Sequence, residues 1–339
     1  MPAISSGKVL VTGANGFIAV WTVKALLDAG FSVRGAVRSL SKAEHLKTIF
    51  SSYAGKLEFA IVPDMIEGGA FDQAVVGIDA IVHTASPVHL AANDPAEVIE
   101  PAVNGTLGVL RAAAARSASI QRVVYVSSCA AVLTRDAPEP HVYDETCWND
   151  EDVNAVQTLG RAAEPLAKYS ASKIFAERAA WAFYEEHKGA LSWDLVVVNP
   201  PWVFGPVLHE VGSGPKSLND SNRLLFEAIT KGSFTVADNC YTDVRDVAQA
   251  LLLAVTKPAA SGERIIASAR SFKWQDFVVA ASKTSNKVQP LQASYDATKE
   301  VYKVVYNNTK SKEVLGVTYR SLEETTADIL KDWETRGYL

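Results

Sequence analysis

Short apolar runs alternate with helical stretches through residues 1–199, and this alternation constrains the fold most. The segment from Phe17 to Ala29 has apolar residues at helical spacing, and Gly30 stands where that helix would end. The runs interpreted as strands are Lys8 to Thr12, Ser32 to Val37, Leu57 to Val62, Ala80 to Thr84, Arg122 to Ser127 and Asp194 to Asn199. Apolar strands joined by crossover helices are typical of a parallel sheet covered on both faces. We therefore predict an α/β fold with a doubly wound parallel (Rossmann) sheet.

The pattern changes after Asn199, where Pro200, Pro201, Gly205 and Pro206 crowd a short stretch. Beyond it we predict helices over Leu224 to Lys231, Val244 to Thr256, Trp274 to Lys283 and Ser321 to Thr335, and a strand over Arg264 to Ala267. The predicted division is a Rossmann domain, residues 1–199, and a smaller C-terminal lobe, residues 200–339. Some segments of this lobe are expected to return to the main sheet.

Charge and composition exclude several classes of partner. The 339 residues include 33 Lys and Arg against 38 Asp and Glu, and no segment clusters the basic residues that a nucleic-acid backbone requires. The apolar runs are shorter than the ~20 residues that span a bilayer, and the N-terminus lacks the zones of a signal peptide. Cys129, Cys147 and Cys240 have no His at metal-ligand spacing. We expect a cytoplasmic protein with reduced thiols, no metal, and no nucleic-acid or membrane partner.

A glycine-containing turn separates the first predicted strand from the first helix. It reads Thr12-Gly13-Ala14-Asn15-Gly16-Phe17-Ile18-Ala19, with Asn15 and Ala19 in place of the second and third glycines of the dinucleotide-binding motif. A turn without a ligand would need the same glycines. Because this turn begins a series of βαβ units, we favour a pyrophosphate site at the helix N-terminus, and so a dinucleotide-binding domain.

The end of the second predicted strand bears on the choice of dinucleotide. It carries Arg38, with Lys42 behind it, and no acidic residue lies between Ser32 and Ala43. An acid at this place would bind a ribose 2′-hydroxyl, whereas Arg suits a 2′-phosphate. A solvated Arg at a strand end is the alternative interpretation. We favour binding of NADPH/NADP+.

Tyr169 and Lys173 stand four residues apart, which places both on one face of a helix. The spacing alone is weak, because it recurs at Tyr184/Lys188, Tyr295/Lys299 and Tyr306/Lys310. Topology distinguishes them: ligands bind beyond the carboxyl ends of the strands, and the helix after the strand ending near Ser127 begins at that edge. Tyr184 lies about 22 Å further along this helix. We therefore expect only Tyr169 and Lys173 to reach a nicotinamide.

Ser127 and Ser128 bring hydroxyl groups to the same edge, although either could simply cap the strand. An ammonium beside Tyr169 would lower the pKa of the phenol from about 10 towards working pH. The phenol would then exchange a proton with a substrate, while a serine hydroxyl polarises the carbonyl.

At these residues the chain resembles the extended short-chain dehydrogenases/reductases. The shared motifs are Thr12-Gly13-x-x-Gly16-Phe17-Ile18-Ala19, Ser127-Ser128, Tyr169-x-x-x-Lys173 and Asn199-Pro200-Pro201-x-x-x-Gly205-Pro206. The resemblance covers essentially the whole chain. It is greatest to the dihydroflavonol-reductase-like branch, which includes fungal aldehyde and ketone reductases of the methylglyoxal-reductase type. Arg38 and His83-Thr84-Ala85-Ser86 support this branch.

The resemblance implies specific roles. Ser128 would orient the carbonyl, Tyr169 would act as the acid, and Lys173 would hold the nicotinamide ribose and tune Tyr169. The cofactor-binding residues implied around the pyrophosphate, 2′-phosphate, adenine and nicotinamide are Gly13, Gly16, Phe17, Ile18, Arg38, Asp64, Met65, Ala85 and Pro200. Residues 200–339 would then be mainly a substrate-binding lobe.

Other candidate residues have less support. His83 ends an apolar strand and is more simply a core histidine, and Cys129 has no positioned base, so neither is assigned a catalytic role. Trp148, Trp202 and Phe204 could wall an apolar substrate pocket, or could belong to the core.

The function predicted from these motifs is NADPH-dependent reduction of a small aldehyde or ketone, with the proton supplied by Tyr169. The alternatives are a nucleotide-sugar epimerase or dehydratase and a dinucleotide-sensing protein without catalysis. Family dehydratases usually carry acidic residues after the active-site Ser, where this chain has Cys129-Ala130-Ala131. This difference disfavours dehydration but not epimerisation.

Overall fold

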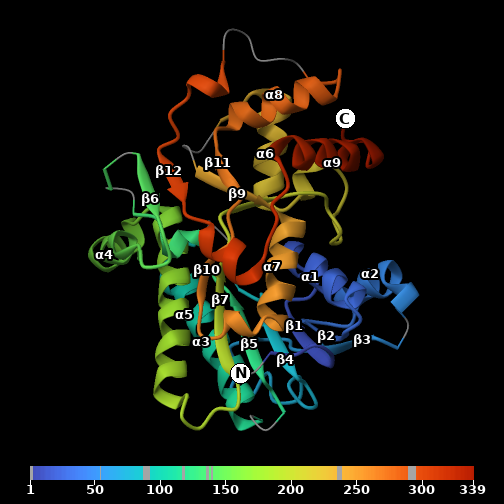
Figure 1. The fold of residues 1–339 in the computed structure, drawn as a ribbon, viewed down its shortest axis with the longest axis vertical. Coiled ribbons are helices and arrows are strands. Elements are labelled where there is room, and N and C mark those ends of the chain that lie inside the picture. The colour runs from blue at the N-terminus through green and yellow to red at the C-terminus, as the bar shows by residue number, and fades with distance from the viewer. Residues whose placement is uncertain are drawn as a thin grey trace.

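A central sheet of seven parallel strands organises the molecule (Figure 1). The computed structural model describes residues 3–53, 55–86, 92–116, 119–134, 137–138, 140–234, 239–288 and 295–339. The strands are β1 (Lys8–Thr12), β2 (Ser32–Val37), β3 (Leu57–Ile61), β4 (Ala80–His83), β5 (Arg122–Val126), β7 (Asp194–Asn199) and β10 (Arg264–Ile266). Their order is β10-β7-β5-β4-β1-β2-β3, so the chain reverses direction across the sheet between β1 and β4. The predicted doubly wound fold is confirmed.

Helices cover both faces of this sheet. One face carries α1 (Phe17–Asp28), α2 (Ser41–Ile49) and α7 (Val244–Thr256), while the other carries α3 (Ala96–Ala115) and α5 (Pro165–His187). The short helix α4 (Asp150–Leu159) packs beside α5. None of the helices that the structure describes is long and apolar enough to cross a membrane.

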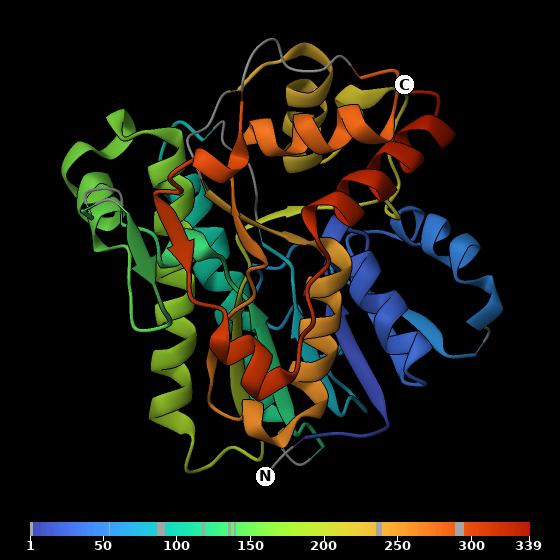
Figure 2. The ribbon, with the colours of Figure 1, turned by 45° about the horizontal axis from the view of Figure 1, so that its top comes forward.

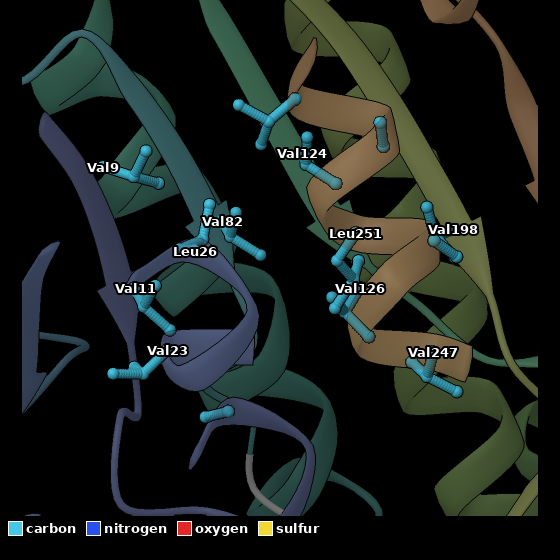
Figure 3. Close-up of a cluster of buried hydrophobic side chains, with 14 of the residues drawn as sticks. Val9, Val11, Val23, Leu26, Val82, Val124, Val126, Val198, Val247 and Leu251 are labelled. Carbon is cyan, nitrogen blue, oxygen red and sulfur yellow. The ribbon is translucent and has the colours of Figure 1, made fainter. Parts of the chain in front are cut away.

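The core explains why the central strands are apolar without interruption. Alternate residues of β1 point to opposite faces: Val9 and Val11 pack against α1, and Leu10 packs in the core on the α3 and α5 side. Figure 3 shows the first of these cores, where Val23 and Leu26 of α1 meet the valines of β1. Each fully buried valine or leucine stabilises the fold by about 1.5–3 kcal/mol.

A second group of elements lies at one end of the molecule, as Figures 1 and 2 show. It contains a three-stranded sheet of β8 (Trp202–Phe204), β9 (Asn239–Asp243) and β11 (Arg270–Phe272). The helices around it are α6 (Asp220–Lys231), α8 (Trp274–Thr284) and α9 (Leu322–Thr335). Beside it, β6 (His141–Tyr143) and β12 (Val304–Tyr306) form a parallel pair.

The chain returns to the main sheet after entering this lobe. β10 pairs in parallel with β7, and α7 packs on the same face of the sheet as α1. The ends of the helices predicted in this half of the chain agree with the observed ends to within four residues. α6 begins at Asp220, before its apolar residues, and Ser321 lies just outside α9, where it forms a capping box with Glu324.

Candidate active site

One cavity of about 840 Å³ follows the carboxyl ends of the strands. The glycine turn after β1 forms one end of it. The segment 218–224 at the start of α6 lines the other end. Ser128, Tyr169 and Lys173 also line the cavity. Because β1 and β4 flank the switch point of the sheet, this is the place where doubly wound folds bind ligands.

The glycine turn fits a phosphate group. Gly13 has a φ of +63°, and a Cβ built on it would lie 3.1 Å from Cα of Ala85, so the backbone conformation and the close approach both require glycine. Gly16 is the N-cap of α1 and provides no side chain to occupy the first amides of the helix. The N–H of Gly16 donates to the backbone oxygen of Gly13 at 2.9 Å and closes the turn. Phe17 and Ile18 follow it and line the cavity, so their backbone N–H groups are positioned for an anion.

Arg38 and Lys42 line the same end of the cavity, and both side chains are exposed. Within the described residues neither cation is engaged in a hydrogen bond or an ion pair. Two unpaired cations, Arg38 directly after β2 and Lys42 in the first turn of α2, suit a phosphate group. The donors therefore fit a dinucleotide that carries a 2′-phosphate.

Three groups with acid–base chemistry meet near the middle of the cavity. Ser128 follows β5 and accepts a hydrogen bond at Oγ from the N–H of Ala130 at 3.1 Å. Tyr169 lies in the second turn of α5, and Nζ of Lys173 lies 5.9 Å from the centroid of its ring. Tyr169 and Lys173 both line the cavity. The residues next to them on α5 are buried.

Burial determines the protonation of these groups. It raises the pKa of Tyr169, and a hydrogen bond with the Ser128 hydroxyl offsets part of that rise. Burial lowers the pKa of Lys173 to about 8, against the opposing effect of Glu177. The expectation that the pKa of Tyr169 is lowered is therefore not met, because burial has the largest effect on the phenol. A phenol that stays protonated suits a proton donor.

His83 is a neutral structural histidine. Thr12 Oγ1 accepts hydrogen bonds from the N–H groups of Thr84 and Ala85, both at 3.1 Å, so its own proton is left for Nδ1 of His83 at 2.8 Å. The ring therefore carries its proton on Nε2. Burial, with the nearby Lys173, lowers the pKa of His83 to about 3. The interpretation of His83 as a core residue agrees with this environment.

Cys129 lines the cavity but is not an activated nucleophile. Its thiol is buried and donates a hydrogen bond to the backbone oxygen of Asn199 at 3.2 Å. Burial raises the pKa of the thiol well above its usual value. Among the described residues no group of three His, Cys, Asp or Glu side chains could hold a metal.

A family comparison agrees with this geometry. The model of the NAD dependent epimerase/dehydratase family matches residues 9–267. The chain belongs to this family. The resemblance predicted from the motifs is thereby confirmed, since the relatives of this family member include fungal reductases.

Two curated relatives of this family member cover nearly its whole length. The ketoreductase azaE of Aspergillus niger is 36% identical in an alignment 335 positions long, which covers 95% of this chain and 96% of the relative. The NADPH-dependent methylglyoxal reductase GRE2 of Saccharomyces cerevisiae is 34% identical, again over 95% and 96% of the two chains.

Solved structures of related proteins have the same fold as this chain. A yeast methylglyoxal/isovaleraldehyde reductase, Gre2, complexed with NADPH superposes with a TM-score of 0.87 at 32% identity, covering 98% of this chain and 100% of that one. A UDP-glucuronic acid 4-epimerase from Bacillus cereus, in complex with NAD, shares the fold at 16% identity and a TM-score of 0.71.

Most predicted site residues of this family member line the cavity. They are Gly13, Gly16, Phe17, Ile18, Arg38, Lys42, Met65, Ala85, Ser128, Tyr169, Lys173, Pro200 and Trp202. Asp64, Trp148 and Phe204 lie outside its lining. Asp64 accepts a hydrogen bond from the N–H of Ile66, and Trp148 stacks against Arg264, with the guanidinium carbon 3.9 Å from the ring centroid. Phe204 is fully buried among aromatic side chains of the lobe.

The alternative tyrosines occupy different places. Tyr184 packs against Trp193, and Tyr295 donates a hydrogen bond to Asp276, away from the cavity. Tyr306, in contrast, lines the cavity, which the sequence did not predict. It arrives through the pairing of β12 with β6, and its hydroxyl lies 3.5 Å from the backbone oxygen of Cys129. Lys310 pairs instead with Glu263 at 2.9 Å, so Tyr306 lacks the neighbouring ammonium that Tyr169 has.

The far end of the cavity contains residues that no motif predicted. Leu133, Leu166, Leu218 and Leu224 come from three separate segments, and all line it. None has a sequence signal beyond an ordinary apolar residue. Their common position depends on the packing of the lobe against the main sheet.

Proposed function

We propose that this protein is an NADPH-dependent reductase of aldehydes or ketones. The observation that carries the proposal is that one cavity contains Ser128, Tyr169 and the buried Lys173 beside a glycine turn and two unpaired cations. The NADPH-dependent relatives over the full chain length support it. This arrangement serves hydride transfer better than it serves binding alone.

The cofactor would lie along the carboxyl ends of the strands. The N–H groups of Phe17 and Ile18 would hold the pyrophosphate, and Arg38 with Lys42 would hold the 2′-phosphate. Ala85 and Pro200 would line the nicotinamide side. Bound there, NADPH supplies the hydride that reduces the carbonyl carbon.

The side chains supply orientation and the proton. The Ser128 hydroxyl donates a hydrogen bond to the substrate oxygen, and Tyr169 transfers its phenolic proton to that oxygen as negative charge develops. A raised pKa keeps Tyr169 in the donor form at neutral pH. The Lys173 ammonium binds the nicotinamide ribose and stabilises the phenolate that remains after proton transfer.

The far end of the cavity favours a substrate with an apolar body. The side chains of Leu133, Leu166, Leu218 and Leu224 lie there, together with Trp202. Such a wall gains free energy from burying a branched or aromatic group, while Ser128 and Tyr169 fix the carbonyl.

The deciding experiment is a turnover assay of the purified protein with NADPH and with NADH across a panel of apolar aldehydes and ketones. We expect release of cofactor on each cycle, a preference for NADPH, and one NADPH consumed per alcohol formed. Retained dinucleotide with nucleotide-sugar interconversion and no net NADPH loss would establish an epimerase instead. NADPH binding without turnover would establish a sensing protein.

A further inference from the structure

A fully buried carboxylate lies directly behind the proposed active site. Glu177 is one helical turn beyond Lys173 on α5 and has no solvent exposure. Its oxygens accept hydrogen bonds from Ser127 Oγ at 2.6 Å, Asn199 Nδ2 at 2.8 Å and Arg264 Nε at 2.5 Å. These donors come from just after β5, from the end of β7 and from β10. One side chain thus joins three strands to the helix that carries Tyr169 and Lys173.

The same network holds the backbone around Ser128. Asn199 Nδ2 donates a second hydrogen bond to the backbone oxygen of Ser128 at 3.1 Å. The N–H of Cys129 donates to the backbone oxygen of Pro200 at 2.9 Å. The position of Ser128 therefore depends on an amide that Glu177 itself orients.

Glu177 also supplies negative charge to Lys173. Burial lowers the pKa of Lys173, and Glu177 is the group that opposes this effect. The other side chains that face the ammonium are the neutral His83 and the phenol of Tyr169. Without the carboxylate, Lys173 would lose its proton at a lower pH.

The free-energy cost of burying an ion pair argues against a purely structural role for Glu177. Arg264 and Glu177 are both nearly or fully buried, and an apolar pair of similar volume is often as stable as such an ion pair. Arg264 also donates hydrogen bonds to the backbone oxygens of Glu145 and Cys147. The negative charge of Glu177 is thus balanced by the Arg264 guanidinium, which these hydrogen bonds hold in place.

We propose that Glu177 is a positioning residue for carbonyl reduction, which keeps Lys173 as an ammonium and fixes Ser128 through Asn199. This inference rests on the proposed function. Glu177 does not line the cavity and touches neither substrate nor cofactor, so it acts through Lys173 and Ser128.

The test is the pH profile of kcat for Glu177→Gln, which keeps the shape and removes the charge. Because the carboxylate raises the pKa of Lys173, its removal lowers that pKa, and the alkaline limb of kcat should move by about one to two pH units towards acid. The KM for the carbonyl substrate should change by only a few-fold. An unshifted limb in a folded Glu177→Gln protein would overturn the proposal and leave Glu177 a structural residue.

Arg264→Met provides a matched background. It removes the cation and retains the carboxylate, so its alkaline limb should not move towards acid. If Glu177→Gln alone does not fold, because it leaves Arg264 buried without a counter-charge, the double variant Glu177→Gln/Arg264→Met should be compared with Arg264→Met. These two proteins differ only in the carboxylate, and the acid shift should reappear between them. Identical alkaline limbs of kcat in these two proteins would contradict the proposal.

The pH dependence of NADPH affinity separates this inference from the proposed function. Absence of any carbonyl turnover in the wild type would refute the proposed function, whatever the variants do. Even then, Lys173 at the nicotinamide ribose predicts that the NADPH Kd of Glu177→Gln should begin to rise at a lower pH than that of the wild type. Identical Kd profiles would overturn the role of Glu177 independently.

Discussion

The two ends of the cavity are lined by different kinds of chemical group. At the glycine-turn end, Phe17 and Ile18 at the N-terminus of α1 and the cations Arg38 and Lys42 line the cavity. At the α6 end, leucine side chains and Trp202 form an apolar wall beside the polar residues Asn219, Asp220 and Ser221. The first end suits charged phosphates through fixed donors, whereas the second binds through shape and apolar area. A substitution at either end should therefore affect one ligand and spare the other.

The largest effect should come from the residue between the two ends. Tyr169→Phe keeps the ring and removes the proton donor, so kcat should fall by about 10²–10⁴-fold with little change in NADPH affinity. Steady-state rates and cofactor titrations on the same preparation check this. Tyr184→Phe, on the same helix but away from the cavity, is the control and should retain kcat within a few-fold. An active Tyr169→Phe would refute the assignment of the acid.

Arg38→Ala should act on the cofactor end alone. Loss of one charge-assisted phosphate contact should weaken NADPH binding by roughly ten- to hundred-fold, while NADH binding stays nearly unchanged. Fluorescence titration of both cofactors measures the difference. Lys47→Ala removes a nearby exposed cation that pairs with Glu44, and it should leave both affinities unchanged. An equal loss of both cofactors in Arg38→Ala would contradict the 2′-phosphate site.

Leu224→Ala should act on the other end, with a smaller effect. Removing about 1–2 kcal/mol of apolar contact should raise the KM of an apolar carbonyl by about five- to thirty-fold, with the NADPH Kd unchanged. The adjacent Leu225 is fully buried and does not line the cavity. Leu225→Ala should instead lower the thermal stability and leave the KM of the folded enzyme unchanged. An unchanged KM in Leu224→Ala together with a raised KM in Leu225→Ala would show that the α6 end does not contact the substrate.

The two ends also differ in how far the sequence predicts them. The glycine turn is a run of consecutive residues between β1 and α1, and its chemistry depends on local backbone geometry, so the sequence indicates it directly. Tyr169 and Lys173 needed one further step, the choice of the helix that begins at the carboxyl edge of the sheet.

Other parts of the site and of its surroundings depend on contacts between residues distant in sequence. Tyr306 reaches the cavity only because β12 pairs with β6, and Glu177 meets Arg264 across 87 positions of the chain. Phe204, for which the sequence left open a pocket wall or the core, packs in the core against Phe272 and Phe277. Residue type cannot distinguish an apolar wall from an apolar core, because burial favours both equally.

The most direct test of carbonyl reduction is the transfer of a labelled hydride. The wild-type protein would be given NADPH that carries deuterium at the transferred position of the nicotinamide, together with an apolar aldehyde or ketone. The account predicts one deuterium on the former carbonyl carbon for each NADPH oxidised, with Tyr169→Phe forming the same labelled product at about 10²–10⁴-fold lower rate. An alcohol without deuterium, or labelled cofactor that returns unconsumed, would contradict it.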